Sequence, residues 1–342
     1  MSELERAAVQ LGEASRLAEY NDVAHGRLAL LLLDNAAEMS LVRSARTPLM
    51  MADHYANLAY QLDDVDPSDH EGQRLKADIS AKVVPRGRRK QIERHFNELV
   101  DFVFEQDDYP LEPAFAGCLK ILHRYRNAAY HEDVVRADVL GPAVQISFFL
   151  CCHLLKSERG FMDQIDVAPP AVAEILGDFP QSGHVLGDNF ATSSGLARDL
   201  ANYFLQARGL DHVGIADALA EHLEGRLASL DRDLTTVSLN GPFPLKRWAV
   251  LQLVQQAPTQ REDFDKEPPE DFWTRPVPVT VALLEDWMRA AAELRHVHDA
   301  VEALRRFASI EQPLAQLELP VERFIIDIDR EEQLAIDLAR GK

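Results

Sequence analysis

The chain of 342 residues has few cysteines and no long apolar run. It has three cysteines, Cys118, Cys151 and Cys152, an odd number with no Cys-x-x-Cys pair, which argues against a disulfide scaffold. Each lies in an apolar run, so we expect buried thiols in a reducing compartment. The longest apolar stretches, LALLLL and AVQISFFLCCHLL, are shorter than the roughly 20 residues that a membrane-spanning helix requires. No secretory leader follows Met1, because the first residues are charged throughout. We therefore expect a soluble cytoplasmic protein with no membrane partner.

Positive charge is also scarce. Lys and Arg number 36 against 56 Asp and Glu, and the formal net charge is −20. The balance is −6 over residues 1–160 and −14 over residues 161–342. Phosphate binding depends on basic surface, so a nucleic-acid contact on this chain requires a local basic patch. Between Arg74 and Leu99 eight basic residues meet three acidic ones, although a solvated loop and helix start explains this run about as well.

Signatures of several common enzyme classes are missing. The chain contains no G-x-x-x-x-G-K-[ST], so no P-loop NTPase is indicated, and neither G-x-S-x-G nor H-E-x-x-H occurs. His123 and His131 are eight residues apart on one helical stripe, but no convincing third residue completes a set of metal ligands. We therefore expect no metal ion and no other cofactor.

What the sequence does contain is helical periodicity. Apolar residues recur at spacings of three and four over 14–46, and Pro48 is expected to limit that helix. A second helix is predicted over about 87–105, and a third begins near Pro113, where proline suits a first turn. An apolar helix follows the Gly-Pro pair at 141–142. Four substantial helices in succession predict a helical bundle.

The second half of the chain is also predicted to be mostly helical. Helices are expected around residues 171–177, 194–208, 211–231, 245–256 and 281–308. Residues 257–280 hold five prolines and are typical of an extended connector. RFIIDID, near the C-terminus, is a candidate short strand before a terminal helix. The prediction is an all-α protein with two domains, a four-helix bundle over 1–160 and an acidic, mostly helical domain over 161–342.

A cluster of basic and polar residues, RYRNAAYHED, lies late in the third predicted helix. At about 100° per residue, one stripe contains His123, Asn127 and His131. Arg124 returns to the side of His131, whereas Arg126 lies on its flank beside Tyr130.

An arginine and a histidine held together can process a phosphodiester. Arginine offers a planar charged fork that matches phosphate oxygens and stabilises charge on a phosphorane. Histidine titrates near neutrality and can take or give the proton of a sugar hydroxyl or of a leaving oxygen. The alternative is that basic residues favour the C-terminal end of a helix through its macrodipole.

Two carboxylates lie on the apolar face of the first predicted helix. Asp34 and Glu38 are four residues apart and share a face with Leu30, Leu31 and Leu41. Burying an unpartnered charge costs several kcal/mol, so both carboxylates require partners from another helix. The Arg/His cluster is one candidate partner, and a purely structural salt bridge meets the same requirement.

The order of these features resembles the HEPN domain, the four-helix module of many prokaryotic toxin and defence ribonucleases. Its hallmark is an arginine followed, after four to six residues, by a histidine, usually with a polar residue directly after the arginine. RNAAYH fits this pattern as Arg126, Asn127 and His131. Arg124 fits the longer gap too, but the asparagine directly after Arg126 favours Arg126.

The resemblance covers roughly residues 14–160 and implies specific roles. It implies a homodimer whose two motifs face each other across a cleft, and metal-independent cleavage that leaves a 2′,3′-cyclic phosphate and a 5′-hydroxyl. His131 would be the general acid or base, and Arg126 would bind and stabilise the scissile phosphate. Asn127 would position one of them, and Glu38 would orient Arg126 or His131.

Further residues are assigned supporting roles. Tyr130 is expected to stack on a base or to pack, Arg124 to flank the substrate, and Asp34 and His123 to support the site. The charge pattern alone, not the resemblance, suggests that a basic run holds the RNA backbone (Arg86, Arg88, Arg89, Lys90 and Arg94).

Residues 161–342 resemble no family. They are expected to sense a trigger, to bind an antitoxin or regulatory partner, or to shield the cleft with negative charge. Two alternatives to a ribonuclease stay open. One is a catalytically silent helical protein for dimerisation and partner binding, and the other is a nucleotide or phosphate sensor that uses the same Arg–His site.

Overall fold

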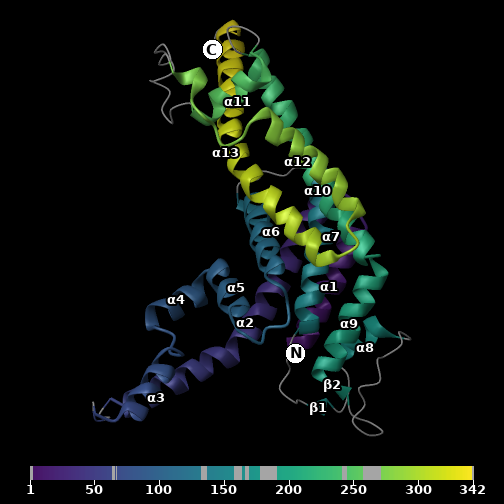
Figure 1. The fold of residues 1–342 in the computed structure, drawn as a ribbon. Helices are drawn as coiled ribbons and strands as arrows, with labels where there is room; N and C mark the ends of the chain where they lie inside the picture. Colours follow the sequence, from purple (N-terminus) through teal and green to yellow (C-terminus); the bar gives the residue numbers. More distant parts are fainter. Residues whose placement is uncertain are drawn as a thin grey trace. The chain divides into compact units, whose positions relative to one another are not determined.

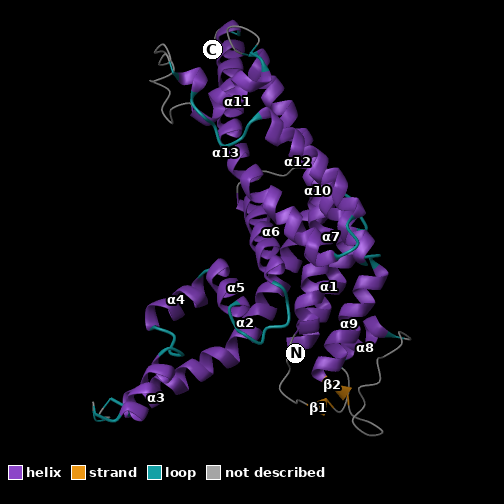
Figure 2. Cartoon of the chain, viewed as in Figure 1, coloured by secondary structure: helices purple, strands orange, loops and turns teal. Residues whose placement is uncertain are grey.

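The chain is all-α, as predicted. The computed structural model describes residues 3–63, 66, 68–131, 137–157, 164–165, 169–177, 191–240, 245–256 and 271–340. Figures 1 and 2 show that these residues are almost entirely helical, and thirteen α-helices lie within them. The exception is one antiparallel pair of two-residue strands, β1 (Gln164–Ile165) and β2 (Ala191–Thr192).

The chain forms two compact units, residues 1–215 and 216–342, whereas the sequence predicted a boundary at residue 160. The boundary lies within helix α10 (His212–Leu239). The difference has a physical cause, since α8 (Pro170–Leu176) packs against α1 (Glu3–Ala18) and α9 (Ser193–Ala207) packs against α7 (Ala137–Ser157). Residues beyond 160 therefore complete the core of the first unit.

Helix α7 is the centre of that core. It packs against α1, α2, α6 and α9, and most of its side chains are buried. By length and composition α7 could cross a membrane, but 72% of its most apolar window is buried inside the protein, as in the core helix of a soluble protein. The three cysteines are buried as predicted, and burial raises the pKa of Cys152 to about 12.

Helix α2 (Val23–Gln61) positions the candidate site and is longer than predicted. Asn21 turns the chain in the left-handed region (φ 51°), and Asp22 caps the new helix by accepting the His25 N–H at 3.0 Å. The prediction that Pro48 limits this helix is wrong. Ala45 and Ala52, seven residues apart, are both buried, so packing on each side of the proline keeps the helix continuous.

The helix predicted over 87–105 is two helices, α4 (Arg86–Arg94) and α5 (Phe96–Phe104). Between them His95 has an extended backbone (φ −122°, ψ 119°). Helix α3 (His70–Ser80) buries no side chain and α4 buries only Ile92. Both lie apart from α1, α7 and α9 in Figure 1.

The third predicted helix is α6 (Pro113–His131), which begins at Pro113 as expected. It packs against α2, α5 and α7. Residues 124–131 of the RYRNAAYHED stretch therefore lie in the C-terminal turns of a helix held on three sides, and residues 132–133 lie outside the described part of the chain.

The second unit contains the rest of α10, α11 (Arg247–Gln256), α12 (Val281–Glu293) and α13 (Ala300–Ala339). The helix predicted over 281–308 is interrupted, because a 3-10 turn over Leu294–His296 and three further residues separate α12 from α13. Of the connector predicted over 257–280, residues 257–270 lie outside the described part of the chain.

The strand predicted at RFIIDID is wrong, because these residues continue α13. Leu314, Leu317 and Val321 are buried at spacings of three and four, and the half-buried Phe324 and Ile328 extend this helical pattern through the stretch. A local alternation of apolar and acidic residues is too short to outweigh burial along the whole helix.

A buried charge cluster joins α10 and α13. The Arg226 guanidinium donates to the carboxylates of Glu311 and Glu318, and all three side chains are at most 8% exposed. Burial alone lowers the pKa of Arg226, but the two glutamates outweigh this effect and raise it. The cluster therefore stays charged and holds the two helices in register.

Replacing Arg226 with methionine leaves two buried carboxylates without their cation. We expect Arg226→Met to lower the free energy of unfolding by about 3–5 kcal/mol, measured by urea denaturation followed by circular dichroism. Arg232→Met, an exposed arginine on the same helix, is the control and should change it by about 0.5 kcal/mol or less. Equal stability of the two variants would contradict the role of the cluster.

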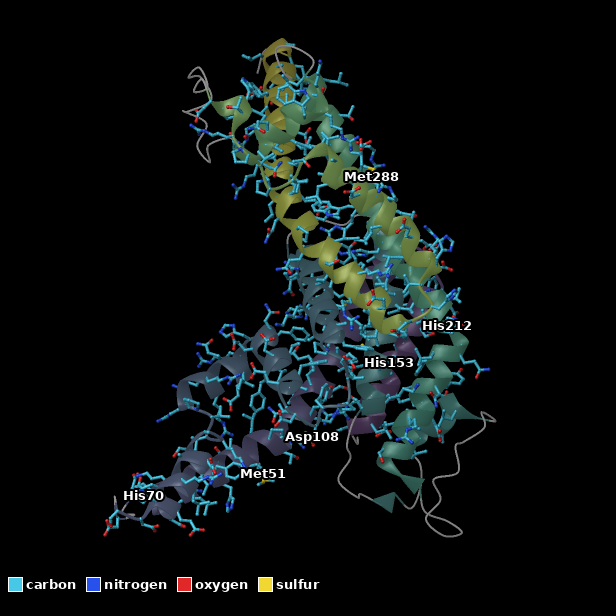
Figure 3. The ribbon with its side chains drawn as sticks, viewed as in Figure 1. Met51, His70, Asp108, His153, His212 and Met288 are labelled. Carbon is cyan, nitrogen blue, oxygen red and sulfur yellow. The ribbon has the colours of Figure 1, made fainter. Side chains whose placement is uncertain are left out.

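A half-buried polar group lies on α7. The His153 ring, labelled in Figure 3, contacts the rings of Phe149 and Phe115 at centroid distances of 4.3 and 5.2 Å. Burial, with a smaller contribution from Lys156, lowers the pKa of His153 to about 4. The folded protein therefore keeps this imidazole neutral at pH values where the unfolded chain protonates it.

This pKa predicts a loss of stability in mild acid. Above the unfolded pKa of about 6.5, His153 takes nothing from the free energy of unfolding. As the pH falls from there toward the folded pKa, the free energy of unfolding decreases, because the unfolded chain binds a proton that the folded protein does not. Between pH 7 and pH 5, His153 should lower the free energy of unfolding by about 2 kcal/mol. His153→Phe should remove this part of the pH dependence, measured by urea denaturation at both pH values, whereas replacing the exposed His54 should not. An unchanged pH dependence in His153→Phe would refute the assignment.

Candidate functional site

The candidate site is built around one buried carboxylate. Asp34 lies on α2 with its side chain 7% exposed, and two residues of α6 donate to it. His123 Nδ1 is 2.9 Å from Oδ1, and Arg126 Nε is 2.7 Å from Oδ2. The Nη2 group of Arg126 donates to the same Oδ2. One aspartate thus fixes both an imidazole and a guanidinium.

Asn127 completes the orientation of the arginine. Arg126 Nη1 donates to Asn127 Oδ1 at 2.7 Å, so hydrogen bonds account for three of the five guanidinium N–H groups. The other two donate to no residue that the structure describes, and the side chain remains 17% exposed. The arginine is therefore rigidly held with two donors left for a ligand.

His123 is held as firmly as Arg126. The ring of Phe96, the first residue of α5, stacks on the imidazole with centroids 4.0 Å apart and an interplanar angle of 8°. Because a carboxylate oxygen can only accept, Nδ1 carries the hydrogen that faces Asp34, and Nε2 is the ring nitrogen left for another partner. His123, expected only as a supporting residue, is thus fixed by the same carboxylate as Arg126.

The end of α6 is held by a second contact from α2. Arg27 donates to the backbone carbonyl of Ala129, which lies in the last turn of α6 that the structure describes. Arg27 is not among the site residues predicted from the sequence. Its position seven residues before Asp34, and hence on the same face of α2, is the signal that indicates its role.

Glu38 is not part of this network. Helices α2 and α6 run antiparallel here, since Arg27 meets Ala129 and Asp34 meets His123. One turn beyond Asp34, Glu38 is therefore displaced toward the beginning of α6. It is half-buried and forms no hydrogen bond or ion pair with a described residue. Of the two predicted partners of Glu38, Arg126 is oriented by Asp34 instead, and the His131 side chain lies outside the described part of the chain.

The other predicted residues of the motif, His131, Arg124 and Tyr130, form no part of the Asp34 network that the structure describes. His131 is the last residue of α6, four residues after Asn127, and its side chain lies outside the described part of the chain. Arg124 is exposed and pairs with no described residue, so Arg126 alone of the two motif arginines belongs to the network. The Tyr130 side chain is 57% exposed.

The basic run on α4 divides into two groups. Arg88 pairs with Glu105, the residue directly after α5, and Arg89 pairs with Asp53 of α2 and with Glu93. The other three are exposed and pair with no described residue (Arg86, Lys90 and Arg94). The sequence alone gave no means of separating these groups, since the partners Asp53 and Glu105 are distant along the chain.

This arrangement can bind an anion and move a proton. Arg126 presents two N–H donors, and His123 presents Nε2, a ring nitrogen that can exchange a proton with a ligand. The Asp34–Arg126 pair has no net charge, so the guanidinium offers direction more than coulombic attraction. In the described part of the chain, no three His, Cys, Asp or Glu side chains are grouped as ligands for a metal ion.

No protein-family model matches this chain, and no curated protein or solved structure is significantly similar to it. What the site does is therefore inferred from its own residues.

The network predicts unequal roles for the two acidic residues of α2. Asp34→Asn removes the charge that holds Arg126 and His123, and should lower the free energy of unfolding by about 2–4 kcal/mol. Glu38→Gln, one turn away on the same helix, should change it by about 0.5 kcal/mol or less. Thermal and urea denaturation of both variants measure the difference. Similar losses in the two variants would show that Asp34 has no special role.

Proposed function

We propose that the first unit is a metal-independent endoribonuclease of the HEPN type, acting in the cytoplasm in a toxin or antiphage-defence setting. The observation that carries this proposal is the Asp34–Arg126–Asn127 arrangement, in which an arginine is oriented on two sides and keeps two N–H donors for a ligand. A further support is that Arg126 lies late in α6, with four residues between it and His131, the histidine of the Arg–His motif.

The reaction needs only groups that the chain provides. The 2′-oxygen of a ribose attacks the adjacent phosphorus and forms a P–O2′ bond while the P–O5′ bond breaks. His131 takes the 2′-hydroxyl proton or gives a proton to the leaving 5′-oxygen, and the two free N–H groups of Arg126 stabilise the phosphorane charge. The products are a 2′,3′-cyclic phosphate and a 5′-hydroxyl. No water is consumed, and no atom changes its oxidation state.

Assembly and regulation are also part of the proposal. The chain acts as a homodimer in which two copies of the motif share one cleft. Residues 161–342, with a formal charge of −14, hold an antitoxin or regulatory partner. An acidic surface of this kind favours basic partners and disfavours RNA outside the active region.

The test is RNA cleavage by the purified full-length chain in EDTA, with the product ends identified by mass spectrometry. Arg126→Ala and His131→Ala should each slow cleavage by about 10²–10⁴-fold. Arg289→Ala is the control, because Arg289 is an exposed arginine of the second unit (67% exposed) with no role at this site; it should retain the wild-type rate.

Each other outcome has a defined meaning. Cleavage that survives both Arg126→Ala and His131→Ala would remove the assigned site. Loss on His123→Ala with retention on His131→Ala would move the proton transfer to His123. Absence of cleavage by the wild-type chain would refute the ribonuclease. A thermal shift with nucleotides that Arg126→Ala abolishes would then identify a phosphate sensor, and no shift would leave a helical partner-binding protein.

A further inference from the structure

The Arg126 site needs positive charge from elsewhere in the molecule. Asp34 already neutralises Arg126, and the chain as a whole carries a formal charge of −20. Affinity for an RNA strand comes largely from neutralised phosphates, so cations outside the Asp34 network must supply it. We propose that Arg86, Lys90 and Arg94 of α4 bind successive backbone phosphates of a single-stranded RNA segment beside the cleaved bond. This inference rests on the proposed function.

Ion pairing separates these three cations from the others on α4. Arg88 is neutralised by Glu105, and Arg89 by Asp53 and Glu93. These pairs join α4 to α5 and α2 and fix the orientation of the helix. The three remaining cations are exposed and pair with no residue that the structure describes (Arg86, Lys90 and Arg94).

The three cations form one stripe that turns slowly around the helix. They are spaced at four residues, so each lies about 6 Å along the helix axis from the next and about 40° around it. Ile92, the one buried residue of α4, lies on the opposite side of the helix. The spacing is close to that of successive phosphates in an extended strand, which long basic side chains can follow.

The stripe begins beside the site. Arg94 is two residues before Phe96, whose ring stacks on His123, and His123 shares Asp34 with Arg126. The chain between Arg94 and Phe96 spans only about 7 Å. Lys90 and Arg86 follow at increasing distance from the site. A strand whose scissile phosphate meets Arg126 can therefore continue along α4.

A single strand fits this path better than a duplex. In-line attack by a 2′-oxygen requires a backbone conformation that a regular A-form helix does not adopt. Duplex RNA is also recognised mainly across its wide minor groove and through two strands. One narrow row of three cations matches the phosphates of one strand.

The experiment measures binding separately from cleavage. The probe is a fluorescent 2′-O-methyl oligouridylate, which has no 2′-hydroxyl to attack, and its anisotropy is followed against the full-length chain over a range of salt concentrations. The test variant carries Arg86→Gln, Lys90→Gln and Arg94→Gln. It should bind about tenfold or more weakly, and its slope of log K against log[salt] should be shallower by about 2.

Two controls separate the stripe from net charge. A variant with Arg289→Gln, Arg305→Gln and Arg306→Gln loses the same charge from exposed positions of the second unit, with side chains 67%, 60% and 52% exposed. It should bind as the wild type does. A variant with Arg86→Lys and Arg94→Lys keeps the charge of the stripe and should keep most of the affinity.

Unchanged affinity and salt slope in the test variant would overturn the inference, as would equal losses in the charge control. Tighter binding of a 2′-O-methyl duplex than of the single strand would also overturn it. The proposed function fails separately. Stripe-dependent binding without cleavage of unmodified RNA would refute the ribonuclease but support the RNA-binding stripe. Cleavage of RNA that does not depend on the stripe would support the ribonuclease but refute the RNA-binding stripe.

Discussion

The site depends on the carboxylate of Asp34, which is buried between α2 and α6. A charge in that position is tolerated only because His123 and Arg126 both donate to it, and their donation in turn fixes two chemically active side chains on α6. Arg27 adds a second link from the same face of α2 to the last turn of α6. The register between two helices and the geometry of the site are therefore set by the same contacts.

The pairing of Arg126 with Asp34 reduces the net positive charge of the site. An arginine paired with a buried aspartate is held in one orientation, but the pair has little net charge to attract a phosphate. The strongly acidic chain makes the deficit larger. In the proposed account helix α4 offsets this deficit, because its ion pairs hold the helix against α2 and α5 while three further cations face outward. The proposal thus assigns orientation and attraction to different helices.

The sequence predicts the helices well where the apolar period is long, as in α6 and α7, and it predicts that a carboxylate of α2 needs a cationic partner. It does not distinguish Asp34 from Glu38, because the choice depends on the antiparallel packing of α2 against α6. Pro48 misled the prediction of α2, since burial on both sides of it outweighs one lost hydrogen bond. The domain boundary was misplaced because α8 and α9 have no sequence feature that assigns them to the first core.

The most direct measurement is the RNA cleavage rate of Arg126→Lys in EDTA. Lysine keeps the positive charge but lacks the planar fork that contacts Asp34, Asn127 and a phosphate at the same time. The account predicts a rate close to that of a variant without any cation at this position. A rate close to that of the wild type would show that charge alone suffices, and would contradict the claim that Asp34 orients a guanidinium for catalysis.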